Sequence, residues 1–122
     1  MISYPSDRWA FGLLGFFAVA EEIPAGRLVH LRPDGLLQLA DGPESVAAHG
    51  VVLQTIAAGA AGQAYRLGEV RGLSGKHPGL AQWLGASGQF TETPPTAGIS
   101  QVVGVAIAAD TVALGLHMPV QL

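Results

Sequence analysis

The stretch from Glu69 to Leu116, EVRGLSGKHPGLAQWLGASGQFTETPPTAGISQVVGVAIAADTVALGL, decides the fold. Within it, short apolar runs with the residue preferences of strands are separated at close intervals by Gly, Pro and Ser. Runs of this length, bounded by turn residues, are typical of the short strands of a small all-β domain. Near its end, Ile99–Ile107 and Thr111–Leu116 flank Ala108-Ala109-Asp110, which predicts a β-hairpin.

A second hairpin is predicted closer to the N-terminus. Ile23-Pro24-Ala25-Gly26 has the composition of a turn, and Arg27–Arg32 follows as an apolar run with strand character. Pro33-Asp34-Gly35 then separates that run from Leu36–Ala40, and a Pro-Asp-Gly turn between two short apolar runs indicates a hairpin.

Turn residues divide the rest of the chain in the same way, and Gly50–Ile56 predicts a central strand. About eight short strands at a spacing of about ten residues indicate a small antiparallel β-barrel or β-sandwich. We assign this all-β domain to residues 23–122, and no amphipathic helix of ordinary length is expected.

Residues 1–22 are predicted to form an extended N-terminal arm with a strongly apolar part. Trp9–Ala20, WAFGLLGFFAVA, is apolar on every face and favours an extended segment that is buried on both sides. Its aromatic side chains could fill the core of the domain, or they could bind a neighbouring subunit or another partner protein. Residues 23–122 already predict a complete β-domain, which favours the second interpretation. The candidate interface residues of the arm are Trp9, Phe11, Leu13, Leu14, Phe16 and Phe17.

Two aromatic residues outside the arm are secondary interface candidates. Tyr65 and Trp83 are expected in the core or in contacts between subunits. A sugar-binding platform would require several exposed aromatic residues with polar neighbours, and the sequence offers only Gln82 and Gln89 as such neighbours.

The low charge content favours a protein that buries surface against other molecules. Charged residues make up 12% of the 122 residues, whereas a typical soluble domain has about 25%. A membrane location is not favoured, because Trp9–Ala20 is shorter than the roughly 17–25 residues of a spanning helix. Assembly with copies of the chain or with a partner explains the composition better.

Other features argue against further partners and against a secretory leader. The formal net charge is −3 and the six Lys and Arg residues are scattered, so nucleic acid is not an expected partner. Ala18-Val19-Ala20 has the form of a signal-peptide cleavage site. The segment before it, however, holds Arg8 as its only basic residue and is interrupted by Gly12 and Gly15, so a signal peptide is not favoured.

No pattern of catalytic, cofactor-binding or metal-binding residues is found. The histidines at 30, 49, 77 and 117 have no spacing typical of metal ligands, and the chain has no cysteine. Gly72-Leu73-Ser74-Gly75 fits a turn better than a nucleophile elbow. We therefore expect no enzymatic activity, no cofactor and no metal.

The order of the turn and strand motifs resembles a β-module of tailed bacteriophages. Over roughly the last four fifths of the chain, the resemblance is to head-fibre and head-decoration (capsid cement) proteins, including the head spike proteins of gene transfer agents. It is carried by the following motifs: Ile23-Pro24-Ala25-Gly26, Leu36-Leu37-Gln38-Leu39-Ala40, Ala48-His49-Gly50-Val51-Val52, Gly68-Glu69-Val70, Gly72-Leu73-Ser74-Gly75, Pro78-Gly79, Trp83-Leu84-Gly85, Thr93-Pro94-Pro95 and Gln101-Val102-Val103-Gly104-Val105-Ala106. The N-terminal aromatic segment departs from the pattern.

This resemblance implies a virion structural protein that is made in the bacterial cytoplasm and located on the outer surface of the head. The implied partners are the chain itself, as a trimer or pentamer, and a major capsid protein or a fibre or spike protein. The alternative is that the protein is a receptor- or glycan-binding module of a phage fibre. This alternative predicts an exposed groove that is lined by aromatic and polar side chains.

Overall fold

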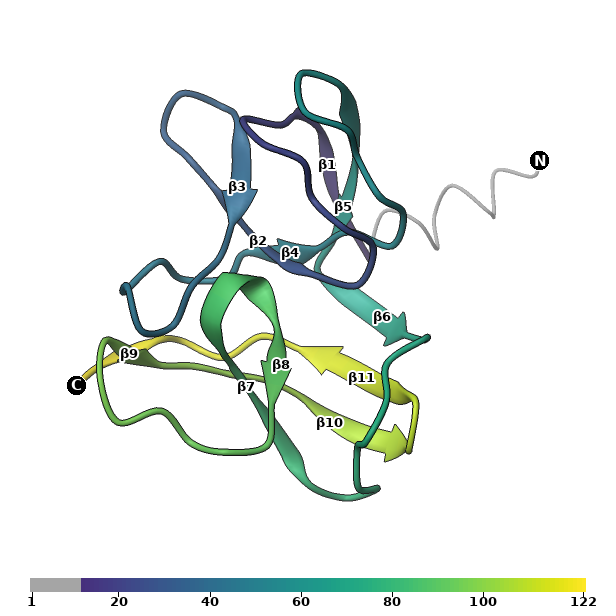
Figure 1. Ribbon diagram of the computed structural model, residues 1–122, viewed down its shortest axis with the longest axis vertical. Helices are drawn as coiled ribbons and strands as arrows, with labels where there is room; N and C mark the ends of the chain where they lie inside the picture. Colours follow the sequence, from purple (N-terminus) through teal and green to yellow (C-terminus); the bar gives the residue numbers. More distant parts are fainter. Residues whose placement is uncertain (1–11) are drawn as a thin grey trace.

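The computed structural model describes residues 12–122 and is built almost entirely of β-strands (Figure 1). Strands make up 46% of the structure and helical turns 4%, and the sheets are antiparallel, which confirms the all-β prediction. The described residues form twelve strands, of which eight are three residues or longer and four are two-residue strands. A single turn of 3-10 helix, η1 (Ala86–Gly88), interrupts them.

The first sheet holds five strands in the order β1-β5-β4-β2-β3. Its members are β1 (Leu13–Ala18), β2 (Leu28–Leu31), β3 (Leu37–Leu39), β4 (Gly50–Val51) and β5 (Ala61–Tyr65). Val19, directly after β1, forms a parallel bridge with Leu37, and the Ala20 N–H donates to the Leu37 carbonyl at 3.0 Å. The two ends of the strand order therefore meet at this point, and the sheet curls into a partly closed barrel.

The second sheet also holds five strands, in the order β6-β11-β10-β7-β8. They are β6 (Leu67–Val70), β7 (Ala81–Leu84), β8 (Phe90–Thr91), β10 (Val102–Ala108) and β11 (Thr111–Gly115). A small third sheet pairs β9 (Ile99–Ser100) with β12 (Val120–Gln121). In Figure 1 the first sheet occupies the upper half of the molecule and the second sheet the lower half.

Both predicted hairpins are confirmed. β2 and β3 pair in register from Val29 with Leu39 to Leu31 with Leu37, and β10 and β11 pair around Val105 with Ala113. In the β2–β3 turn, Gly35 has φ +88, a conformation that glycine adopts without steric cost. The Asp34 carboxylate accepts the Leu36 N–H at 3.1 Å and binds Arg32 at 2.7 Å, so the turn residues fold as the sequence predicts.

Two clusters of buried side chains stabilise the two halves of the structure. The first cluster lies between the sheets, since it contains Leu28 and Val51 from the first sheet and Val103 and Val112 from the second. The second cluster belongs to the first sheet and its loops, and Val29 is among its members. Successive residues of a strand point to opposite faces, so β2 and β4 are buried on both sides.

The apolar part of the predicted arm joins the first sheet. β1 pairs with β5 as an edge strand, and Val19 is buried in the second cluster. The prediction of an extended segment is confirmed for Leu13–Ala18. The prediction that this segment is buried on both sides is wrong within the chain, because Phe16 is 67% exposed and Ala18 is exposed as well.

The predicted central strand Gly50–Ile56 is shorter than expected, because only Gly50–Val51 pairs as a strand. The Gly26 and Arg27 backbone takes over the pairing at Val52, through hydrogen bonds of 2.8 and 3.1 Å. Ile56 then forms an isolated bridge with Ile23, and the three residues between Val52 and Ile56 are exposed.

A buried glutamine joins the two sheets. The side chain of Gln101, between β9 and β10, is 2% exposed. Its Oε1 accepts the Ala48 N–H at 2.8 Å, and its Nε2 donates to the carbonyls of Ala48 and His117, both at 3.0 Å. The side chain thus satisfies three backbone groups that no sheet pairs.

Candidate functional site

The candidate interface residues of the arm fall into three groups. Trp9 and Phe11 lie outside the described residues. Leu14 and Phe17 pack against the second buried cluster, and Leu13 is half-buried opposite Tyr65 in the β1–β5 pair. Phe16 alone among the described members of this set is strongly exposed, so it is the one available to a partner.

Tyr65 and Trp83 lie on different sheets. Tyr65 packs against the first buried cluster and pairs with Val51, while Trp83 pairs with Val102 and Thr91 in the second sheet. Both side chains are half-buried. The structure therefore does not bring the two secondary candidates together.

The outer face of the second sheet presents a continuous apolar surface. Val105 pairs with Ala113 on one side and Ala81 on the other, and directly paired residues share a face. Trp83 and Ile107 stand two residues further along their strands and lie on the same face. We define the apolar face by the following residues: Ala81, Trp83, Val102, Val105, Ile107 and Ala113.

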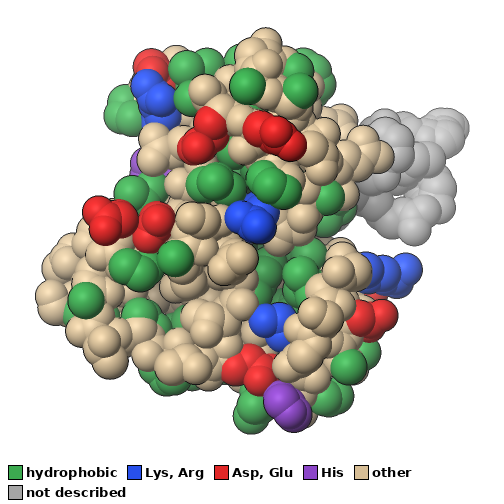
Figure 2. Space-filling view, viewed as in Figure 1, with side chains coloured by type: hydrophobic (Ala, Val, Ile, Leu, Met, Phe, Trp, Pro, Cys, Tyr) green, Lys and Arg blue, Asp and Glu red, His purple; other side chains and the backbone are tan. Residues whose placement is uncertain are grey.

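This face has no charge along its central strands. β7, β10 and β11 contain no Asp, Glu, Lys or Arg, while Val105 is 43% and Ile107 49% exposed. Glu69 on the edge strand β6 pairs directly with Ala113, so its carboxylate lies at the margin of this face, where it binds Arg71 at an N–O distance of 2.9 Å. Figure 2 shows charged side chains as small separate groups on the visible face of the molecule. An exposed apolar sheet face with uncharged central strands is a typical contact surface for another protein.

The most polar cluster on the second sheet is centred on Glu92. One carboxylate oxygen accepts from the His77 ring at 2.8 Å, and the other accepts the His77 N–H at 2.8 Å and the Gln82 amide at 3.0 Å. The hydrogen bond from the His77 side chain, followed by those from its backbone and from Gln82, lowers the pKa of Glu92 to about 2. Lys76 donates to the Phe90 carbonyl at 2.9 Å, so the cluster fixes the β6–β7 connection to β8.

Glu92 is expected to make the free energy of unfolding depend on pH in acidic solution. A carboxyl group whose pKa falls on folding stabilises the fold above its ordinary pKa of 4.5, and this contribution is lost as the pH falls toward about 2. In Glu92→Gln that contribution is absent, so the difference in free energy of unfolding between the two proteins should shrink over this range. Urea unfolding at a series of pH values measures it, with Glu44→Gln as the control. A difference that does not change with pH would contradict the assignment.

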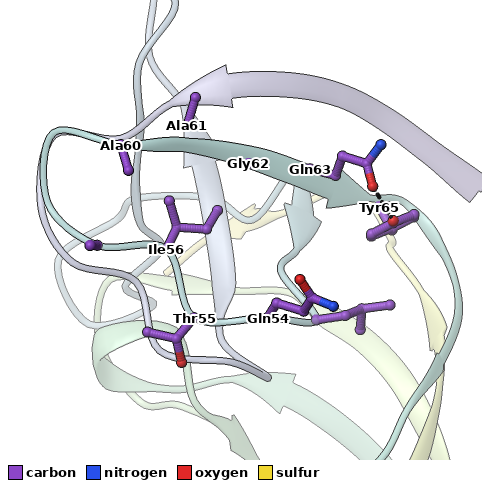
Figure 3. A pocket seen from close by; sticks show the side chains of 10 residues that line it. Gln54, Thr55, Ile56, Ala60, Ala61, Gly62, Gln63 and Tyr65 are labelled. Atoms are coloured by element: carbon purple, nitrogen blue, oxygen red, sulfur yellow. Dashed lines mark hydrogen bonds between the residues drawn. The ribbon is translucent and has the colours of Figure 1, made fainter.

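A hollow of about 310 Å³ lies between the Leu53–Ala60 loop and β5 (Figure 3). Gln54, Thr55, Gln63 and Tyr65 contribute its polar atoms, and no charged residue lines it. The Tyr65 hydroxyl donates to Gln63 Oε1 at 2.7 Å, and Thr55 Oγ1 accepts the Ala25 N–H at 3.0 Å, so three of these four side chains have partners within the chain. The hollow contains one aromatic side chain, and Trp83 is not part of it. It lacks the several aromatic residues that a glycan-binding groove was expected to show.

Sequence reasoning missed three polar pairings that the structure brings together. These are His77 with Glu92, Gln101 with Ala48, and the stacked rings of His30 and His49. A glutamine inside the apolar run around β10 is a signal that could have indicated Gln101. The other two pairs join residues 15 and 19 positions apart, with no local spacing to indicate them.

Comparisons with known proteins do not add an identity to these observations. No model of a protein family matches the sequence, and a search of curated proteins found no match. Within residues 12–122, no group of three or more His, Asp, Glu or Cys side chains is placed to hold a metal ion. The same part of the chain has no helix that is long and apolar enough to cross a membrane.

Proposed function

We propose that this protein is a structural subunit that assembles with copies of itself on the outer surface of a phage or phage-like capsid. In this role it is a head-decoration protein or the base of a spike or fibre. It acts through contact surfaces and needs no catalytic group. The chain itself and a capsid, spike or fibre protein are the partners.

The apolar face of the second sheet carries this proposal. Val105 and Ile107 on β10 expose nearly half of their surface. The three strands of this face, β7, β10 and β11, hold no charged residue. Burying apolar surface contributes roughly 25 cal/mol per Å². Repeated copies on a particle turn several modest contacts into firm attachment. The resemblance of the turn and strand motifs to phage head modules supports the location on a virion.

Phe16 on β1 offers a second contact. It lies on the first sheet, away from the apolar face, and is 67% exposed. A subunit with one contact surface on each sheet can use one of them for copies of itself and the other for the capsid or a spike. We assign self-association to the apolar face, because it presents two exposed apolar side chains, Val105 and Ile107, whereas β1 presents one, Phe16.

Light scattering on three purified proteins tests the self-association. The wild-type chain is expected to form a discrete oligomer, and Val105→Asp is expected to be a monomer at the same concentration, because a buried unpaired carboxylate opposes association. Val120→Asp is the matched control, since Val120 is 60% exposed but lies on β12, outside the apolar face. It should keep the mass of the wild type.

Two outcomes would contradict the assignment of the interface. A monomeric wild-type chain would remove the basis for assembly, and an oligomer that survives Val105→Asp would place the interface elsewhere. The virion location needs a separate measurement. Antibodies against the chain should label the surface of particles released by cells that carry this sequence, and labelling confined to particle-free fractions would contradict it.

A further inference from the structure

The loop segment Ala47–His49 is attached to the first sheet by two histidines. His30 on β2 and His49 stack with ring centroids 4.5 Å apart and an angle of 29° between the rings. His30 Nδ1 contacts the Ala47 carbonyl oxygen at 2.8 Å. The Leu31 N–H donates to His49 Nδ1 at 2.9 Å. We call these two side chains the histidine pair.

These contacts fix where the protons are on the two rings. A carbonyl oxygen only accepts, so His30 Nδ1 must carry a proton and donate it. A backbone N–H only donates, so His49 Nδ1 must be unprotonated. The histidine pair therefore has this geometry only while His49 is neutral.

The imidazole of His49 replaces a strand at the end of the β2–β4 pair. β4 pairs with β2 at Leu28 and Val29, and the His49 N–H continues this pairing to the Val29 carbonyl at 2.8 Å. The next amide along β2, that of Leu31, has the His49 ring as its acceptor instead of a backbone carbonyl. A titratable side chain thus takes the place of a group that does not titrate.

The segment held by the histidine pair also contacts the second sheet. Both the N–H and the carbonyl of Ala48 bind the buried side chain of Gln101. Ala47–His49 therefore lies between β2 on one side and the start of β10 on the other. Release from β2 also breaks the backbone hydrogen bond from the His49 N–H to Val29, and it leaves the Gln101 side chain, which does not titrate, to hold the segment.

We propose that the histidine pair is a pH-sensitive fastening that holds Ala47–His49 on β2 near neutral pH and releases it in mildly acidic solution. A proton on His49 Nδ1 would turn it into a donor that faces the Leu31 N–H, so this hydrogen bond must break. A proton on Nε2 of His30 leaves the bond to Ala47 intact but places a positive charge against the ring of His49. Two protons on the pair add repulsion between the stacked rings.

The groups around the histidine pair are consistent with release on protonation. The pKa of His49 is lowered below its ordinary value, first by partial burial and second by His30. Arg32 and Asp34, at the end of β2, bind each other, and Asp41 at the base of the loop accepts the amides of Glu44 and Ser87. Glu21 accepts the Leu39 N–H on β3. No carboxylate among these contacts is paired with either ring, so the described surroundings supply no counter-charge for a protonated pair.

The sign of the pH dependence follows from the lowered pKa. The released segment binds a proton on His49 below about pH 6.5, whereas the attached segment resists it. The attached form is therefore fully favoured above the ordinary histidine pKa and loses stability as the pH falls toward the lowered pKa of His49. The equilibrium between the two forms shifts by up to about tenfold per pH unit for one coupled proton.

Amide hydrogen exchange measured by NMR between about pH 7.5 and about pH 5 tests the proposal, because histidines change charge in this range. In the wild-type chain, the protection of the Leu31 amide should fall with decreasing pH by up to about tenfold per pH unit. The amides of β10 and β11 should keep their protection. Unchanged protection of Leu31 over this range would overturn the proposal.

A substitution separates the histidine pair from other titrating groups. His49→Asn keeps an acceptor, Asn Oδ1, near the position of Nδ1 but does not titrate. Protection of Leu31 in this variant should no longer depend on pH, whereas the control His117→Asn should behave as the wild type. The same pH dependence in His49→Asn would overturn the proposal. If His49→Asn does not fold, the comparison of Leu31 with the β10 and β11 amides in the wild type decides the question. His30 lies on β2 and His49 directly before β4, both outside the apolar face, so these outcomes do not depend on the proposed assembly.

Discussion

Replacing Gln101 with leucine is expected to lower the free energy of unfolding by about 4 kcal/mol. The leucine side chain has a similar size, but it satisfies none of the three backbone groups that the amide binds. The side chain is 2% exposed, so water does not easily replace the lost hydrogen bonds. Each buried backbone group left without a partner costs about 1–3 kcal/mol, and leucine recovers part of this through its apolar surface.

Urea unfolding of the variant and of Gln54→Leu measures this effect. Gln54 is exposed in a loop, and its substitution should change the free energy of unfolding by less than about 0.5 kcal/mol. Equal midpoints for Gln101→Leu and the wild type would show that the buried amide does not join the sheets as described.

Gly98→Ala is expected to destabilise the fold by a similar amount, about 4 kcal/mol, through a backbone contact. Gly98 has φ +78, and a methyl group at this position would lie 2.5 Å from the Pro43 carbonyl oxygen and closer still to that of Gly42. Both obstacles are backbone atoms, which cannot rotate away. In the same region the Ile99 N–H donates to the Gly42 carbonyl at 2.9 Å, so a shift of this backbone would also disturb β9.

Gly35→Ala is the matched control for this prediction. Gly35 has φ +88, but a methyl group there would meet no atom within 4 Å. It should therefore cost only the conformational part, about 1 kcal/mol. The difference between the two variants in thermal or urea unfolding reports the steric part alone. Equal losses at both sites would contradict the close approach of Gly98 to Gly42 and Pro43.

The hairpins were predictable because their information is local. Pro33-Asp34-Gly35 encodes its own turn through the fixed φ of proline, the Asp34 side chain and the positive φ of glycine. The length of β4 was not predictable, because Val52 pairs with the turn at Gly26 rather than with a strand. The end of β4 is set by contacts between segments that are distant in the sequence, and a single apolar run does not indicate these contacts.

The contact surfaces were predictable only in part. The aromatic run predicted a set of interface candidates, but it did not distinguish Phe16, which is exposed, from Phe17, which packs inward. A β-bulge between Leu13 and Gly15 shifts the alternation in this strand, so the outward residues could not be read from the period. Of the apolar face, only Trp83 was named from the sequence, because the six residues come from three strands whose order along the sheet was unknown.

The absence of charge on β7, β10 and β11 has a thermodynamic consequence for assembly. Contacts through these three strands should respond little to salt or to pH, because the strands themselves hold no ion pair to screen, and the Glu69–Arg71 pair lies at the β6 margin of the face. They should instead show a negative heat capacity change on association, and they should weaken on cooling. Calorimetry at several temperatures would therefore detect the joining of subunits, while titration with acid would detect the loosening at His30 and His49. Temperature and acidity would then act on two different parts of one small domain.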